Sequence, residues 1–293
     1  MVNDLTAFST ELADVVGKVG KSVVAVDARP RYGSSGVFWR PGIVVTAEHT
    51  IRREEEIGVA LPDGKTVSAT VSGTDAGTDI AVLKVDGQAG DAPVIASGDP
   101  APGNLALALG RSPDSGVNAT LGIISAVSGS WRTWRGGRLD RYIRLDLTMY
   151  PASSGGLVVN AKGEAIGIAT SALSRIAGLA IPASTVDRVV DEILSRGHVA
   201  RGYLGVGLQP VELPDHHKCL IVLSLEPEGP ASKAGVLIGD VLVSLGGTPV
   251  TDTDDIQAVL ERHSVGQTIE AGVVRGGVAL NVGVVIGERS RRN

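Results

Sequence analysis

The chain has 293 residues, of which 43% are hydrophobic and 20% charged, and its formal net charge is −5. This length allows one large domain or two of ordinary size. The acidic balance argues against binding to nucleic acid or to an anionic membrane, and no apolar run approaches the roughly 18 residues that span a bilayer. The single cysteine, Cys219, excludes an internal disulfide and is expected to be a small buried hydrophobic residue.

Short segments rich in valine and isoleucine follow one another from residue 22 to residue 181. Turn sequences such as 62–65 and 160–163 separate them at hairpin spacing. This rhythm predicts an antiparallel barrel or sandwich. The predicted strands are 22–26, 42–46, 56–61, 66–71, 80–85, 105–109, 120–125, 142–147, 156–159 and 165–169.

A helix is predicted after these strands, because apolar residues recur at helical spacing from residue 186 to residue 194. Ser184 is its expected N-cap, and Gly197 is expected to close it. A domain boundary is predicted near residues 197–202.

The remaining chain is predicted to form a small α+β module. Thr251 and Thr253 are capping candidates for its helix, and the chain ends, 1–4 and 290–293, are expected to be frayed. The predicted strands are 220–223, 241–245, 269–274 and 278–284, and the predicted helix is 254–262.

Three separated residues have the chemistry of a serine hydrolase. Ser154 lies in a glycine-flanked turn, where its hydroxyl can attack and backbone N–H groups can hold an oxyanion. His49 follows an apolar strand and is the expected base, and Asp79 opens another strand and would hold the histidine Nδ1–H. Each alone is also an ordinary turn or loop residue. Together they follow the chain order of chymotrypsin.

A series of short motifs, around these residues and further along the chain, indicates a protein family. They are Ser35-Gly36-Val37, Val45-Thr46-x-x-His49, Thr78-Asp79-Ile80-Ala81-Val82-Leu83-Lys84, Ser153-Ser154-Gly155-Gly156, Ala180-Ile181-Pro182, Tyr203-Leu204-Gly205-Val206, Gly229-Pro230-Ala231-Ser232-Lys233-Ala234-Gly235-Val236 and Gly239-Asp240-Val241-Leu242. In this order they resemble the HtrA/Deg family of serine proteases.

The resemblance implies a mainly β protein with a chymotrypsin-like double β-barrel and a small α+β PDZ domain. The implied boundaries are an N-terminal segment at 1–21, the protease domain at 22–198 and the PDZ domain at 201–288. It also implies a catalytic triad of His49, Asp79 and Ser154, with no metal and no cofactor. The backbone N–H groups of Ala152 and Ser154 would form the oxyanion hole.

Three residues near the nucleophile depart from the family pattern, which has glycine, asparagine and proline where this chain has Ala152, Ser153 and Leu157. Glycine tolerates backbone angles that a Cβ resists. We therefore expect Ala152 to bias the turn toward a closed, inactive oxyanion hole and to make activity low or conditional.

The expected substrate pocket is uncharged, which favours a small or medium apolar P1 side chain. Met149 would lie toward its floor, although core packing is an equally good interpretation of this residue. The remaining candidate pocket residues are Tyr150, which could narrow the pocket, and the wall residues Gly178, Leu179 and Ala180.

The loop of Tyr203, Leu204, Gly205 and Val206 would bind the C-terminal carboxylate of a peptide, which would add as a strand beside the helix at 254–262. A folded PDZ domain with no ligand in use is the alternative. In the family, the loop matching residues 131–138 senses PDZ or partner contacts, so Arg132 or Arg135 is expected to relay activation. The cluster Asp215-His216-His217-x-Cys219 matches no common zinc spacing and is expected to be a solvated loop.

The resulting prediction is a serine endopeptidase of protein quality control, active in the stress response on unfolded or damaged polypeptides. The alternative is a catalytically silent, chaperone-like peptide-binding protein with the same fold. The family forms homotrimers through N-terminal segments, so residues 4–16, with Phe8 as an apolar contact, are expected to mediate assembly. The chain starts without a secretory signal, which predicts a cytoplasmic protein if Met1 is the native start and a periplasmic or envelope protein if an export segment is missing.

Overall fold

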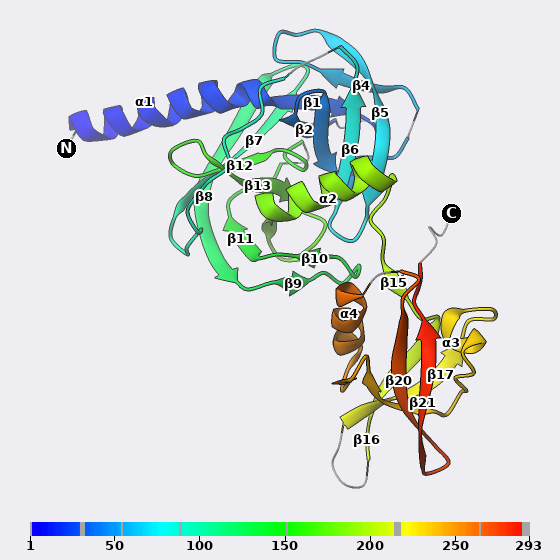
Figure 1. The fold of residues 1–293 in the computed structure, drawn as a ribbon. Coiled ribbons are helices and arrows are strands. Elements are labelled where there is room, and N and C mark those ends of the chain that lie inside the picture. The colour runs from blue at the N-terminus through cyan, green and yellow to red at the C-terminus, as the bar shows by residue number, and fades with distance from the viewer. Residues whose placement is uncertain are drawn as a thin grey trace. The chain divides into compact units, whose positions relative to one another are not determined.

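The computed structural model describes residues 2–29, 33–53, 55–87, 90–150, 152–213, 218–263 and 265–288. The chain divides into two compact units, Met1–Val199 and Ala200–Asn293. Strands predominate in both (Figure 1), so the mainly β fold class is confirmed. None of the helices in these ranges is long and apolar enough to cross a membrane.

The first unit contains two closed barrels of six antiparallel strands each, and the predicted double barrel is confirmed. The first barrel has the order β1-β2-β3-β6-β5-β4, with β1 at Val23–Asp27, β2 at Ser34–Arg40, β3 at Ile43–Ala47, β4 at Ile57–Ala60, β5 at Thr66–Asp75 and β6 at Ile80–Val85. The second has the order β11-β14-β13-β12-β7-β8, with β7 at Leu105–Ser112, β8 at Gly116–Ser128, β11 at Tyr142–Asp146, β12 at Leu157–Val159, β13 at Ala165–Thr170 and β14 at Gly178–Pro182.

One core joins the two barrels. Its buried side chains include Val45 and Ile80 of the first barrel, Leu157 and Ile168 of the second, and Val189 of the helix α2 (Ala183–Arg196). Burial of apolar area, worth roughly 25 cal/mol per Å², stabilises this contact. It fixes the strand ends of one barrel against the turns of the other, where the proposed catalytic residues lie.

The helices of this unit differ in part from the sequence prediction. The helix α1 (Val2–Val19) was not predicted and includes residues 2–4, where fraying was expected. The N-cap of α2 is Pro182, so the prediction of Ser184 as the cap is wrong, whereas Gly197 closes the helix with φ of 80° as predicted. Two short 3₁₀ helices complete the unit, η1 at Gly20–Ser22 and η2 at Glu48–Thr50.

Among the strands that were not predicted, the three longer than two residues lack the expected sequence pattern. β2 begins with buried serines, and β14 ends in a proline. β16 (Val206–Glu212) of the second unit contains a glycine and a proline, which sheets tolerate mainly at an edge. The segment at 131–138, predicted to be a hairpin loop, is a hairpin of two short strands, β9 (Trp131–Arg132) and β10 (Arg138–Leu139).

The second unit is a sheet with helices, as expected for the α+β module. The sheet order is β16-β17-β18-β20-β21, with β17 at Lys218–Leu225, β18 at Val241–Leu245, β20 at Thr268–Arg275 and β21 at Val278–Val285. The remaining elements are β15 (Gly202–Tyr203), β19 (Thr248–Pro249), β22 (Gly287–Glu288), α3 (Pro230–Lys233) and α4 (Thr253–Arg262). Asp252 caps α4 in a capping box with Asp255, so the prediction of Thr251 or Thr253 as the cap is wrong.

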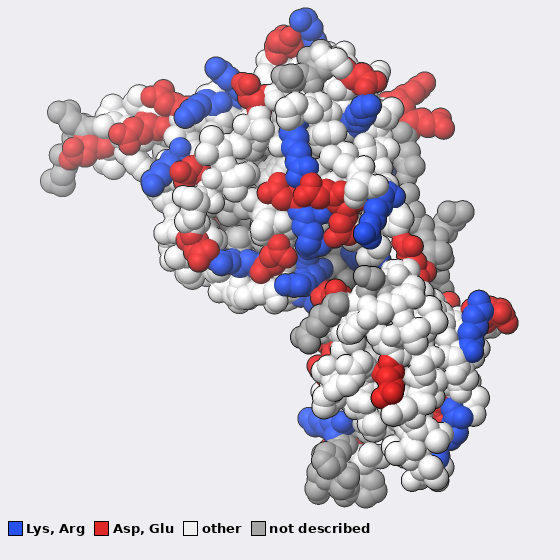
Figure 2. All heavy atoms as spheres, viewed as in Figure 1, with Lys and Arg blue, Asp and Glu red and all other residues white. Residues whose placement is uncertain are grey.

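Charged side chains of both signs are interspersed on the face drawn in Figure 2. The cluster predicted at Asp215, His216 and His217 lies outside the described residues. Cys219 is buried, as expected, and its thiol donates to the carbonyl of Val211.

Candidate active site

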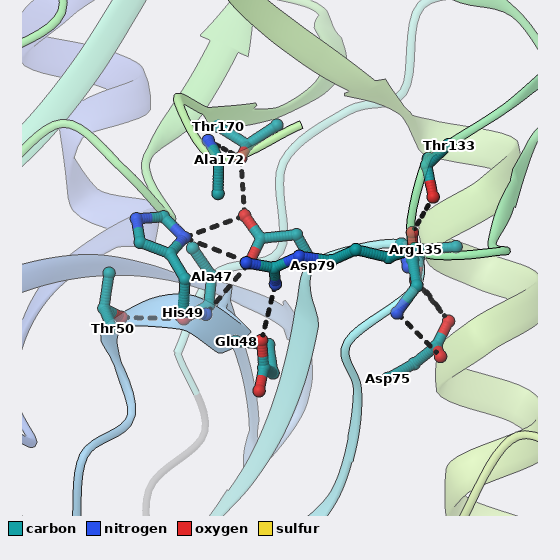
Figure 3. A network of polar contacts seen from close by, with 12 residues as sticks. Ala47, Glu48, His49, Thr50, Asp75, Asp79, Thr133, Arg135, Thr170 and Ala172 are labelled. Carbon is teal, nitrogen blue, oxygen red and sulfur yellow. Dashed lines mark hydrogen bonds and ion pairs between the residues drawn. The ribbon is translucent and has the colours of Figure 1, made fainter. Parts of the chain in front are cut away.

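His49 and Asp79 meet at one end of the first barrel (Figure 3). His49 lies in η2, directly after β3, and Asp79 directly precedes β6; these strands pair up to Ala47 and Ile80. His49 Nδ1 lies 2.9 Å from Asp79 Oδ2, and the His49 backbone N–H donates to Oδ1 at 2.9 Å. Two bonds to one carboxylate therefore fix both the imidazole plane and the chain that carries it.

The Asp79 carboxylate is fully buried and is stabilised by donors from both barrels. The Thr170 hydroxyl, at the end of β13, donates to Oδ2, and this hydroxyl accepts the backbone N–H of Ala172 at 3.1 Å. Hydrogen bonds of this kind replace the water that a buried carboxylate loses. Thr170 was not predicted from the sequence, because only the fold brings β13 to this aspartate.

The turn before Asp79 is held by a second aspartate that sequence reasoning missed. The Asp75 carboxylate accepts the backbone N–H groups of Gly77 and Thr78 and, at 2.7 Å, the Thr78 hydroxyl. Asp79 itself has φ of 59°, which a non-glycine residue adopts at a cost. The sequence Asp75-x-Gly77-Thr78 is an Asx-turn signal that could have identified this support.

Ser154 lies in the turn before β12 and is 3% exposed. Its carbonyl accepts the backbone N–H of Ser35 at 3.1 Å, which ties the turn to the first barrel. Its Oγ lies 3.1 Å from the Oγ of Ser171, and among the described residues this is its hydrogen-bond partner, not His49. The structure thus brings the three predicted residues to one region, with the serine hydroxyl turned to Ser171.

The Ala152 carbonyl is held by the first barrel, where it accepts the Ser35 hydroxyl at 2.6 Å. That hydroxyl oxygen in turn accepts the backbone N–H of Arg111 at 2.8 Å. Among described residues other than glycine, only Glu56, Asp79 and Glu228 have positive φ. The observed turn therefore accommodates the Ala152 Cβ without left-handed backbone.

Of the predicted pocket residues, Gly178 and Leu179 lie where β14 pairs with β11. The Met149 side chain lies against Gly178, so closely that a Cβ at Gly178 would be 2.7 Å from Met149 Cγ. Tyr150 is 56% exposed, whereas the Leu179 and Ala180 side chains are fully buried in the core. Neither residue therefore exposes surface to a pocket, and Met149 packs against the core cluster that contains Ala180.

A cavity of about 600 Å³ borders the turn that carries Ser154, at Tyr150 and Ala152. Charged groups of both signs line it, among them Asp27 of β1, Arg29 and Arg111 of β7. A second cavity, of about 610 Å³ in the second barrel, contains none of the predicted site residues.

The predicted peptide-binding loop connects β15 to β16 in the second unit. Leu204 is buried, and its carbonyl and that of Gly205 accept the backbone N–H groups of Ala231 and Glu226, both at 2.9 Å. In a trans peptide the N–H points opposite to the carbonyl. The N–H groups of the same two peptides, those of Gly205 and Val206, consequently point away from Ala231 and Glu226. β16 is an edge strand, and α4 packs beside it.

Comparison with known proteins agrees with this architecture of a double-barrel protease unit and a second small domain. Residues 33–168 match the trypsin-like peptidase domain, and residues 202–286 match the PDZ domain. A probable periplasmic DegP-like serine endoprotease of Halomonas elongata is 33% identical over 277 residues, which cover 89% of this chain and 57% of that protein. A relative of the same description from Rhizobium meliloti is 35% identical over 277 residues, covering 88% and 54%. The chain thus spans little more than half the length of these relatives.

Solved structures extend the likeness over nearly the whole chain. The serine endoprotease from Yersinia pestis has a TM-score of 0.80 and 30% identity, covering 94% of this chain and 97% of that one. The HtrA-type protease AlgW with a decapeptide has a TM-score of 0.81 and 26% identity, covering 96% and 99%. The chain therefore belongs to the HtrA/DegP family of serine endoproteases, which combines a trypsin-like peptidase domain with a PDZ domain.

Proposed function

We propose that this protein is a serine endopeptidase in which Ser154, His49 and Asp79 form the triad. The observation that supports this most directly is the His49–Asp79 pair at 2.9 Å. Thr170 from the other barrel donates a further hydrogen bond to the Asp79 carboxylate. Asp79 would keep the proton on Nδ1 and leave Nε2 free to act as the base. Because the Ser154 hydroxyl bonds to Ser171 in the structure, it must rotate toward His49 before it can attack.

In the proposed reaction Ser154 Oγ attacks the scissile carbonyl while His49 Nε2 takes its proton. The backbone N–H groups of Ala152 and Ser154 would hold the tetrahedral oxyanion, and such a donor contributes on the order of 3 kcal/mol. His49 then donates the proton to the leaving amine, and an acyl-enzyme remains on Ser154. Water, activated by the same histidine, releases the second product.

Labelling with a fluorophosphonate tests this proposal. We expect Ser154-dependent labelling and cleavage of casein by the wild-type protein, and neither by Ser154→Ala. Absence of labelling, with and without a PDZ-binding peptide, would instead favour the chaperone-like alternative. Ala152→Gly is the companion variant, and it should raise the labelling rate if the Ala152 Cβ favours a closed oxyanion hole.

We propose that unfolded or damaged polypeptides are the substrates and that peptide C-termini bind at the PDZ loop. The outward N–H groups of Gly205 and Val206 fit a carboxylate, and the β16 edge fits an added strand. Fluorescence polarisation can compare the affinity for a peptide ending in a free carboxylate with the affinity for the same peptide ending in an amide. Equal affinities would refute a carboxylate site.

We further propose a homotrimer in the periplasm or cell envelope. The exposed apolar side chains of Leu5 and Phe8 on α1 support an assembly contact, and the relatives named above are described as periplasmic. Light scattering coupled to gel filtration should give a trimer that Leu5→Asp with Phe8→Asp dissociates. A monomeric wild-type protein contradicts the first part, and recovery in the cytoplasmic fraction of native cells contradicts the second.

A further inference from the structure

The hairpin at residues 131–139, formed by β9 and β10, is anchored on the first barrel beside two of the proposed catalytic residues. Arg135 Nη1 lies 3.3 Å from Glu48 Oε2, and the Thr133 hydroxyl donates to the Gly77 carbonyl at 2.7 Å (Figure 3). Glu48 directly precedes His49 in the chain, and Gly77 lies two residues before Asp79. We call this segment the clamp hairpin.

The anchor at Gly77 is closely packed. Thr133 is 3% exposed, and its hydroxyl also accepts the backbone N–H of Gly137 at 3.1 Å. A Cβ at Gly137 would overlap the Gly77 carbonyl and lie 2.7 Å from the Thr78 nitrogen. The hairpin backbone therefore rests directly on the turn that carries Asp79, with no room for a larger residue.

The anchor at Glu48 joins opposite charges in a partly enclosed place, where both side chains are 26% exposed. Burial raises the pKa of Glu48, and the nearby Asp79 charge adds to this, whereas Arg135, His49 and Arg52 oppose it. Without Arg135, the Glu48 carboxylate would face Asp79 with less compensation. The guanidinium also lies 4.9 Å from the centre of the Trp134 ring, a cation–π contact that restrains its position.

A shift of Glu48 would reach both catalytic residues through the backbone. Its N–H donates to the Asp79 carbonyl at 3.1 Å, and the next N–H, that of His49, donates to the Asp79 side chain at 2.9 Å. The segments of His49 and Asp79 are thus joined by hydrogen bonds, and the clamp hairpin contacts both of them.

We propose that the clamp hairpin sets the position of His49 and Asp79 relative to Ser154, with Arg135, Glu48 and Thr133 as positioning residues. This inference rests on the proposed triad. The hairpin would act within one chain, on the base His49 and on the carboxylate of Asp79 that orients it. A ligand that displaced the hairpin would therefore slow acylation of Ser154.

The test measures the fluorophosphonate labelling rate of the full chain. Glu48→Gln and Arg135→Gln should each lower the rate roughly fivefold, as expected for loss of a partly buried ion pair that acts on the transition state. The double variant should be no slower than either single variant, because the two changes break one interaction. Arg135→Lys should restore most of the rate, and Arg138→Gln, which removes an exposed arginine of the same hairpin, should match wild type.

Hydrogen exchange gives a readout that does not need activity. Arg135→Gln and Thr133→Val should speed exchange in peptides covering residues 47–52 and 75–80, and Arg138→Gln should not. The clamp is overturned if the wild type labels and the variants label equally fast, or if the exchange pattern is unchanged. Failure of the wild type to label would refute the proposed function instead, and exchange would still decide whether the clamp exists.

Discussion

Gly155 follows the proposed nucleophile and is predicted to tolerate no side chain. Its φ is 82°, and a Cβ there would overlap the Ser35 carbonyl oxygen, lie 2.5 Å from the Thr46 hydroxyl and lie 2.8 Å from the Ala47 nitrogen. The left-handed backbone costs an alanine about 1–2 kcal/mol. Overpacking against backbone adds about 1–3 kcal/mol. Gly155→Ala should therefore lower the free energy of unfolding of the first unit by about 2–5 kcal/mol.

Gly64→Ala is the matched control, because Gly64 has φ of 86° and nothing within 4 Å of an added Cβ. It carries the same backbone cost and the same change in unfolded-chain entropy, so the difference between the variants isolates the steric contact. Urea unfolding followed by tryptophan fluorescence reports on the first unit alone, since Trp39, Trp131 and Trp134 all lie there. Equal losses in the two variants would refute the steric argument.

Three further changes test the two units. Asp79→Asn should lower the acylation rate by about 10⁴-fold, because an amide holds His49 in the wrong tautomer. Fluorophosphonate labelling kinetics measure the rate, and an unchanged unfolding midpoint would show that the variant is still folded. Met149→Ala should shift cleavage toward larger apolar P1 residues in a peptide library, and an unchanged profile would place Met149 in the core instead. Arg275 donates to the Asp240 carboxylate at 2.7 Å and holds its pKa below the ordinary 3.8. The stabilisation is therefore complete above pH 3.8 and lost as the pH falls through the lower folded pKa. Asp240→Asn should cost about 1.5 kcal/mol at pH 7, the low end for charged pairs because Arg275 is partly exposed, and should flatten the acid dependence of hydrogen exchange in β18; a dependence equal to wild type would contradict it.

An antiparallel barrel or sandwich could be predicted because turn sequences separate short valine- and isoleucine-rich segments at hairpin spacing, and the family resemblance specified the double barrel. The helix α2 was predicted from its apolar spacing, and its end at Gly197 from the need for positive φ. Caps were predicted less well, since Ser184, Thr251 and Thr253 have the right chemistry but other residues hold the positions. α1 was missed although half of its residues are apolar, and β2 was missed because the buried serines at its start do not resemble a strand.

The sequence by itself indicated the candidate residues His49, Asp79 and Ser154, because each lies in a short motif that resembles the family. Only the tertiary structure decided their partners. Thr170 reaches Asp79, and Ser171 reaches Ser154, because one core locks the two barrels together. The first pair is separated by 91 positions in the chain and the second by 17. Contacts over such separations depend on how strands pair and pack, which no local pattern of side chains encodes.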